Sequence, residues 1–146
     1  MADWRSDLSS VLNSTSTNPV QTRHEKEASQ MSGFVREVAL PAFAELREEL
    51  EKSGRDVTIR HSESTATIIV YSSGEEEITY RIQSRTFPNG ILPYADIRFK
   101  ERKGLKLIRA ESMVRSGEPD YTLQDVTRDE VIENFLKHYL PRLKAE

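Results

Sequence analysis

Hydrophobic residues in the first third of the chain recur at a helical spacing. Between residues 31 and 50 they repeat about every 3.6 positions, which is typical of a helix that packs one face on a core. The members of this stripe are Met31, Phe34, Val35, Val38, Ala42, Phe43, Leu46 and Leu50. Pro41 interrupts it, because proline lacks an amide hydrogen and crowds the preceding turn, so we expect a kink or a break there. Gly54 is expected to end this helical segment.

After Gly54 the hydrophobic period changes to two, the period of a β-strand. Five short runs are expected to be strands, at residues 57–61, 66–71, 78–85, 94–102 and 105–114. Short turns separate them, and Pro93 is expected to close the connection before the fourth strand. Consecutive short strands with short connections predict an antiparallel meander. Alternation sends five residues to the face that helices cover, namely Ile78, Tyr80, Ile82, Ile97 and Phe99.

The C-terminal segment has a clear helix start. Thr127 and Glu130 have the spacing of a capping box, and Val126 with Val131 can form the hydrophobic staple around it. The apolar face that follows includes Phe135. The sequence therefore predicts an α+β fold, in which an antiparallel sheet of about five strands carries both helical segments on one face. The opposite face is left to solvent or a partner, and the six glycines are expected at helix ends and turns.

Residues 1–19 are expected to form a polar arm, followed by a single domain at 20–146. The arm carries a short amphipathic stripe made of Trp4, Leu8, Val11 and Leu12. A polar linker that ends in Pro19 follows the stripe. The stripe could dock on its own domain, exchange with a second copy, or bind another protein as a helix in a groove.

Composition narrows the possible chemistry. The 146 residues include no cysteine, which excludes disulfides, thiolate zinc sites and a cysteine nucleophile. No apolar run approaches the roughly 20 residues that span a bilayer, and the N-terminus lacks the pattern of a secretory signal. We therefore expect a cytoplasmic protein without a membrane partner.

The charge is distributed unevenly along the chain. Residues 78–115 contain 9 basic and 3 acidic side chains, a net of +6, whereas the whole chain has a net charge of −3. Alternation places much of this excess on the solvent face of adjacent strands. The residues expected to bind an anionic partner are Arg81, Arg85, Arg98, Lys100, Arg102 and Arg109. A solvated face whose charges protect an edge strand from aggregation is the alternative.

Histidines are the natural candidates for acid and base catalysis near neutral pH. His24 lies among charged helix residues, His138 lies beside Tyr139, and His61 falls on the same side of its strand as Glu63. A small enzyme with a pocket around His61 is therefore one alternative. No zinc-binding histidine spacing, phosphate-binding glycine loop or nucleophile elbow is present, so no metal or cofactor is expected.

The order of helix, antiparallel sheet and helix resembles the small dimeric chaperones of bacterial type III secretion, which are also acidic and cysteine-poor. The resemblance is one of architecture and has no sequence motif. Together these observations favour a non-catalytic adaptor or chaperone-like domain, expected to be a homodimer with a protein partner. A nucleic-acid-binding protein that uses residues 81–109 is the second alternative.

Overall fold

The computed structural model describes residues 19–88, 90–100 and 107–144. Its helical segments are α2 (Pro19–Phe34), the π-helical turn η1 (Val35–Ala39), α3 (Leu40–Lys52), the 3₁₀ turn η2 (Leu123–Asp125) and α4 (Arg128–Lys144). Its strands are β1 (Asp56–His61), β2 (Ala66–Ser72), β3 (Glu75–Phe87), β4 (Gly90–Lys100) and β5 (Leu107–Met113). None of the described helices combines the length and apolarity that crossing a bilayer requires.

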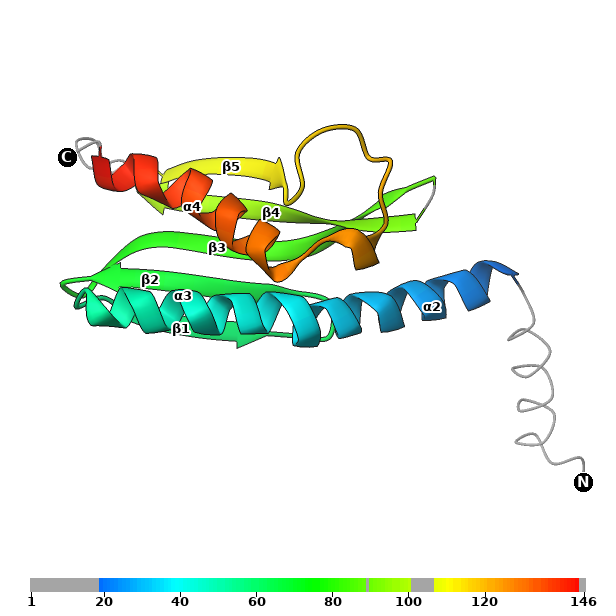
Figure 1. Cartoon of the computed structure of the whole chain (residues 1–146), viewed down its shortest axis with the longest axis horizontal. Coiled ribbons are helices and arrows are strands. Elements are labelled where there is room, and N and C mark those ends of the chain that lie inside the picture. Colours follow the sequence, from blue (N-terminus) through cyan, green and yellow to red (C-terminus); the bar gives the residue numbers. More distant parts are fainter. Residues whose placement is uncertain (1–18, 89, 101–106, 145–146) are drawn as a thin grey trace, which may run out of the picture.

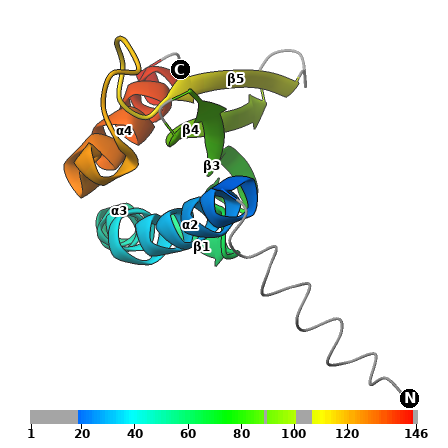
Figure 2. The same cartoon turned by 90° about the vertical axis from the view of Figure 1, so that its right-hand side faces the viewer.

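The five strands form one antiparallel sheet in the order β1-β2-β3-β4-β5. Helix α3 lies along β1, and α4 crosses the strands obliquely (Figure 1). Turning the molecule by 90° shows α3 and α4 on the same side of the sheet (Figure 2). The α+β meander with both helices on one face is therefore confirmed.

The interruption at Pro41 is a wide helical turn. The Leu40 amide donates to the Val35 carbonyl, five residues earlier, so η1 is a π-helical turn. Pro41 then falls in the first turn of α3, the position of a helix that tolerates proline best. The ribbon continues from α2 into α3 along nearly one line (Figure 1). The expected kink is thus absorbed by the π turn.

Two sequence expectations about proline and glycine were wrong. Pro93 lies inside β4, opposite Ser84, and its carbonyl accepts from the Val114 amide just beyond β5. Proline is tolerated because β5 ends at this point, so no residue of β5 requires an amide hydrogen from position 93. Gly33 lies within the continuous helix, not at a helix end or a turn. By contrast, Gly54 ends α3 with φ of 84°, as expected.

The covered face of the sheet holds the core. Ile78, Tyr80, Ile82 and Ile97 are fully buried, as alternation predicted. The Tyr80 ring makes edge contacts with Phe43 of α3 and Phe135 of α4, at centroid distances of 6.0 and 5.5 Å. Its hydroxyl donates to Asn134 Oδ1 at 2.6 Å, and burial raises the pKa of Tyr80 far above its ordinary value. One central tyrosine therefore connects the sheet to both helices.

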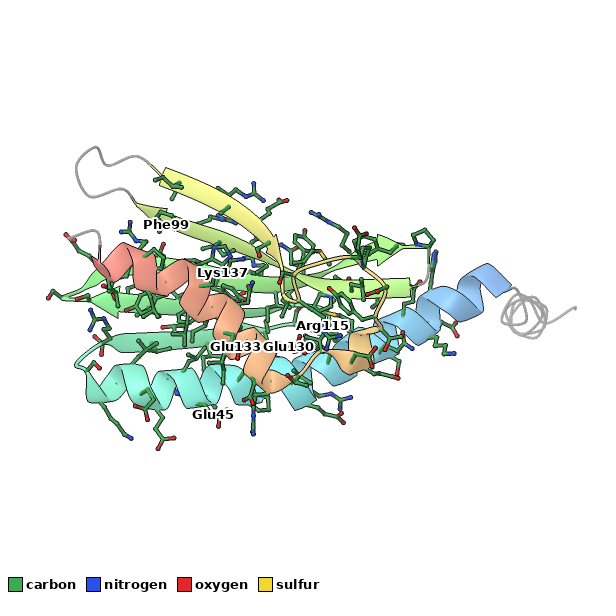
Figure 3. The ribbon with its side chains drawn as sticks, turned by 45° about the horizontal axis from the view of Figure 1, so that its top comes forward. Glu45, Phe99, Arg115, Glu130, Glu133 and Lys137 are labelled. Carbon is green, nitrogen blue, oxygen red and sulfur yellow. The ribbon has the colours of Figure 1, made fainter. Side chains whose placement is uncertain are left out.

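The start of α4 is held by the predicted capping box and by an arginine that the sequence did not reveal. Thr127 and Glu130 exchange the two capping hydrogen bonds, at 3.0 and 3.3 Å. Arg115, which follows β5, donates to both Glu130 carboxylate oxygens and to the Asp125 carbonyl (Figure 3). Hydrogen bonds from Arg115 hold the pKa of Glu130 at about 2. This ion pair fixes the loop after β5 to the helix.

Candidate binding surfaces

The side of the sheet opposite the helices is called the open face here. Strand register and alternation define it, because each member is adjacent in sequence to residues that point into the core. Its members include Asp56, Thr58, Arg60, Thr67, Ile69, Thr79, Arg81, Gln83, Arg85, Tyr94, Asp96, Arg98, Leu107, Arg109 and Glu111. Five of these side chains are basic and three are acidic, so the described part of the open face is net positive.

A salt-bridge network crosses β3, β4 and β5 on the open face. Asp96 is only 3% exposed, and Arg109 donates to its two carboxylate oxygens at 3.0 and 2.9 Å. These bonds raise the pKa of Arg109 above its ordinary value. Arg85 pairs with Glu111 at 3.1 Å and stacks over the Tyr94 ring at 4.3 Å. Two of the predicted anion-binding arginines are therefore already paired with carboxylates.

The two central arginines are bound differently. Arg81 donates to Thr67 Oγ1 at 3.3 Å, and neither Arg81 nor Arg98 forms an ion pair within the described residues. Register places Arg81 opposite Asp96 and Arg98 opposite Arg109. The structure thus brings Arg81, Arg85, Arg98 and Arg109 onto one face of adjacent strands. Lys100 continues β4, but its side chain and all of Arg102 lie outside the described residues.

The open face also has apolar character. Ile69 is 8% exposed even though its neighbours Ile68 and Val70 point into the core, and Thr67 beside it is also buried. Tyr94 is half-buried beneath the guanidinium of Arg85. This face therefore mixes arginines, carboxylates and partly buried apolar side chains.

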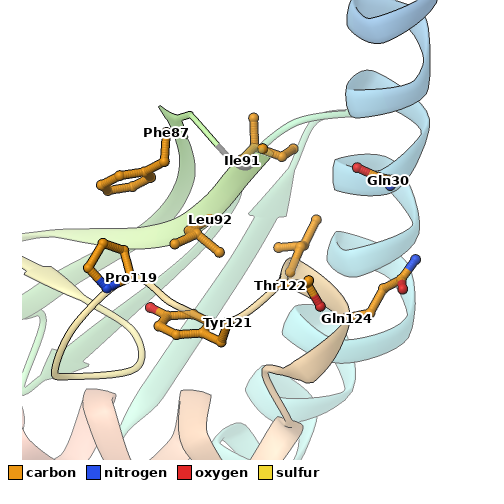
Figure 4. Close-up of a pocket in the computed structure, with 10 residues that line it drawn as sticks. Gln30, Phe87, Ile91, Leu92, Pro119, Tyr121, Thr122 and Gln124 are labelled. Atoms are coloured by element: carbon orange, nitrogen blue, oxygen red, sulfur yellow. The ribbon is translucent and has the colours of Figure 1, made fainter.

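A groove that sequence reasoning missed runs between the N-terminal helix and η2. The part beside η1 has a cavity volume of about 300 Å³ and is lined by Ser29, Gln30, Gly33, Phe34, Glu37, Val38, Leu123, Gln124 and Val126. A smaller cavity of about 120 Å³ adjoins it and reaches the end of the β3–β4 hairpin. Figure 4 shows Gln30 of α2 and Gln124 of η2 at one side of this cavity, with Ile91, Leu92 and Tyr121 at the other. We call the part lined by residues 29–38 and η2 the α2 groove.

The signal for the α2 groove was present in the sequence but ambiguous. Its helical lining positions follow the same 3.6-residue period as the core stripe, displaced by one position. Gly33 was the other signal, since glycine within a helix costs about 1 kcal/mol relative to alanine. The turn η2 has its own capping box, formed by Thr122 and Asp125, and this pattern was also overlooked.

The histidines are not gathered into a site. His24 is exposed, and so is His61 at the end of β1. His61 lines neither the α2 groove nor the smaller cavity beside it. His138 is half-buried in α4, and burial lowers its pKa. Among the described residues, no group of three or more His, Cys, Asp or Glu side chains is arranged to hold a metal ion.

The arm residues Trp4, Leu8, Val11 and Leu12 lie outside the described residues, so their binding role stays a prediction. Comparisons of the chain with protein-family models, with curated proteins and with solved structures found no match.

Proposed function

We propose that this chain is a non-catalytic binding domain that uses its open face to hold an acidic segment of a protein partner. The observation that supports this most directly is the convergence of Arg81, Arg85, Arg98 and Arg109 on adjacent strands of an uncovered sheet face. Five basic against three acidic side chains give that face a potential that attracts anionic groups, although the whole chain is acidic.

The surroundings of the arginines favour a protein partner over nucleic acid. Single-stranded nucleic acid binds sheets through exposed aromatic rings on which bases stack, and the Tyr94 ring is covered by Arg85. Arg85 and Arg109 already hold carboxylates, the groups that an acidic protein segment would present. Arginine and tyrosine beside buried aliphatic residues are the composition enriched in protein interfaces.

A direct test compares two probes of opposite type. A labelled peptide that alternates glutamate with leucine and tyrosine, and a labelled oligothymidine of similar charge, would each be titrated with the full chain at low and high salt. Fluorescence anisotropy would report the dissociation constants. We expect the peptide to bind more tightly and the double reversal Arg81→Glu with Arg98→Glu to lower its affinity at least tenfold, since two like charges then face it.

The matched control reverses two exposed charges on α3, Arg47→Glu with Lys52→Glu, and should leave peptide affinity within about twofold. Preferential binding of the oligonucleotide, with affinity that falls steeply with salt, would replace the proposal by a nucleic-acid function. Equal loss in the open-face and α3 variants would show that net charge alone drives binding and would also refute it.

A further inference from the structure

We propose that residues 3–12 dock as a helix in the α2 groove of the same chain, antiparallel to α2. This inference is independent of the function proposed for the open face. It joins an apolar groove without an occupant among the described residues to the apolar stripe of the arm, a surface that an amphipathic helix tends to bury.

The dimensions of the two surfaces agree. The groove follows the helix from Ser29 to Val38, a length of about 13.5 Å at 1.5 Å per residue. The arm stripe from Trp4 to Leu12 has a length of about 12 Å on the same basis. The groove is bounded on one side by a helix and on the other by η2, which is the usual shape of a site for an amphipathic helix.

Gly33 supplies a reason for close approach. It lies in the middle of the groove lining, and a Cβ atom added there would meet nothing within 4 Å. Within a helix, glycine is less stable than alanine by about 1 kcal/mol. No contact among the described residues compensates for this loss at Gly33. A second helix passing over Gly33 can come nearer than over any larger residue. The open space at this residue is therefore expected to be filled by the arm.

The linker is long enough for the arm to fold back. Gln30 lies about 16.5 Å along the helix from Pro19, and two packed helices lie about 8–10 Å apart. The seven peptide steps from Leu12 to Pro19 can span about 23–25 Å when extended. A return along α2 therefore needs less than the full reach of the linker.

An antiparallel return gives a chemically consistent register. If Leu12 lies opposite Gln30, equal rise in both helices places Leu8 opposite Phe34 and Trp4 opposite Val38. These three of the four stripe residues then follow the groove from end to end. In the same register Arg5 lies opposite Glu37, which is exposed on the groove rim, so opposite charges face each other.

The chain contains a single tryptophan, Trp4, so fluorescence excited at a wavelength that the five tyrosines do not absorb reports the arm alone. The peptide 1–18 serves as the solvent-exposed reference. In the full chain we expect emission at shorter wavelength than in the peptide and a several-fold lower rate of quenching by acrylamide. Emission and quenching equal to those of the peptide would overturn the proposal.

The variant Gly33→Leu is designed to fill the groove and keep the helix, because leucine is the better helix former and its Cβ atom would meet nothing within 4 Å. We expect it to return Trp4 fluorescence to the peptide values. Ala44→Leu is the matched control, since Ala44 is exposed on α3 away from the groove lining, and it should change nothing. A buried signal that persists in Gly33→Leu would refute docking at this groove.

Disulfide trapping distinguishes the same chain from a second copy, in a background without native cysteine. The pair Arg5→Cys with Glu37→Cys should cross-link within the monomer, because a disulfide needs Cα atoms within about 7 Å. The pair Asn13→Cys with Glu37→Cys should not, since eight residues of helix move the thiol by about 12 Å. Cross-linked dimers, or a Trp4 signal lost on dilution, would assign the groove to a second copy and overturn docking within one chain.

Discussion

The two faces of the sheet bury polar groups in different ways. On the covered face, Tyr80 and Asn134 are neutral and bond to each other, and Asn134 also donates to the Met113 carbonyl. On the open face, the buried Asp96 is charged and depends on Arg109, whose side chain is 60% exposed. The pair of Tyr80 and Asn134 is closed to solvent, whereas in the pair of Asp96 and Arg109 the arginine is exposed and can contact another molecule. Substitutions on the covered face should therefore change stability, and those on the open face should change binding.

The largest loss of stability is expected from Phe135→Ala. Phe135 is fully buried between Tyr80 and Tyr139, so truncation removes apolar contacts and leaves a cavity. We expect the free energy of unfolding to fall by about 3–5 kcal/mol. Urea unfolding followed by circular dichroism measures it. Leu140→Ala, at a 41% exposed position of the same helix, should change it by less than about 0.5 kcal/mol.

Tyr80→Phe tests whether the neutral network is a stabilising element. The substitution keeps the ring but leaves the Asn134 oxygen without the hydroxyl that donates to it, and should cost about 1–3 kcal/mol. Because the folded-state pKa of Tyr80 is raised above the unfolded value, the wild type also loses stability as pH rises above about 10. The variant should lack this contribution, and an unfolding free energy unchanged by the variant would contradict the assigned role.

An intermediate effect is expected from Glu130→Gln, which removes the charge that Arg115 holds at the start of α4. At neutral pH the loss should be about 1 kcal/mol, since the pair is partly exposed. The folded-state pKa of Glu130 is lowered to about 2, so its contribution is present above the ordinary value and lost as pH falls toward 2. Wild type and variant should therefore converge in acid, as thermal unfolding between pH 6 and pH 2.5 would reveal. A constant difference across that range would exclude the ion pair as the cause.

The smallest change in stability is expected from Arg98→Glu on the open face. Arg98 forms no ion pair within the described residues, so the free energy of unfolding should change by less than about 0.5 kcal/mol. If binding of the acidic peptide falls at the same time, the separation of the two faces is supported. A loss of stability comparable to that of Tyr80→Phe would break it.

Local sequence patterns predicted the fold because each element had its own signal. Alternation placed Tyr80 and Ile97 in the core, and Thr127 marked the start of α4. The expectation for Pro93 was wrong because proline ends a strand only where a neighbouring strand requires an amide hydrogen from that position. That neighbour is known only once β5 is placed.

The candidate surfaces were less predictable because they depend on pairs of residues distant in sequence. The arginines of the open face followed from alternation, but the Arg109 bond to Asp96 and the Arg85 bond to Glu111 depend on register between strands. The α2 groove depends on η2, which lies about 90 residues after the helix it faces, so the local period of the helix was ambiguous without that partner.

The π turn before Pro41 also sets the rotational phase of the long helix. One additional residue in a helical turn rotates the side chains that precede it by about 100° about the helix axis, relative to those that follow. In this chain, α3 presents Phe43 and Leu46 to the core while the preceding residues present Gly33 and Glu37 to the groove. Deleting one residue between Val35 and Ala39 would restore a regular helix, keep α3 in place and turn Gly33 away from η2. A single-residue deletion would therefore remove the groove and at the same time turn the buried Met31 and Phe34 away from the core, so the π turn is what lets one helix serve both surfaces.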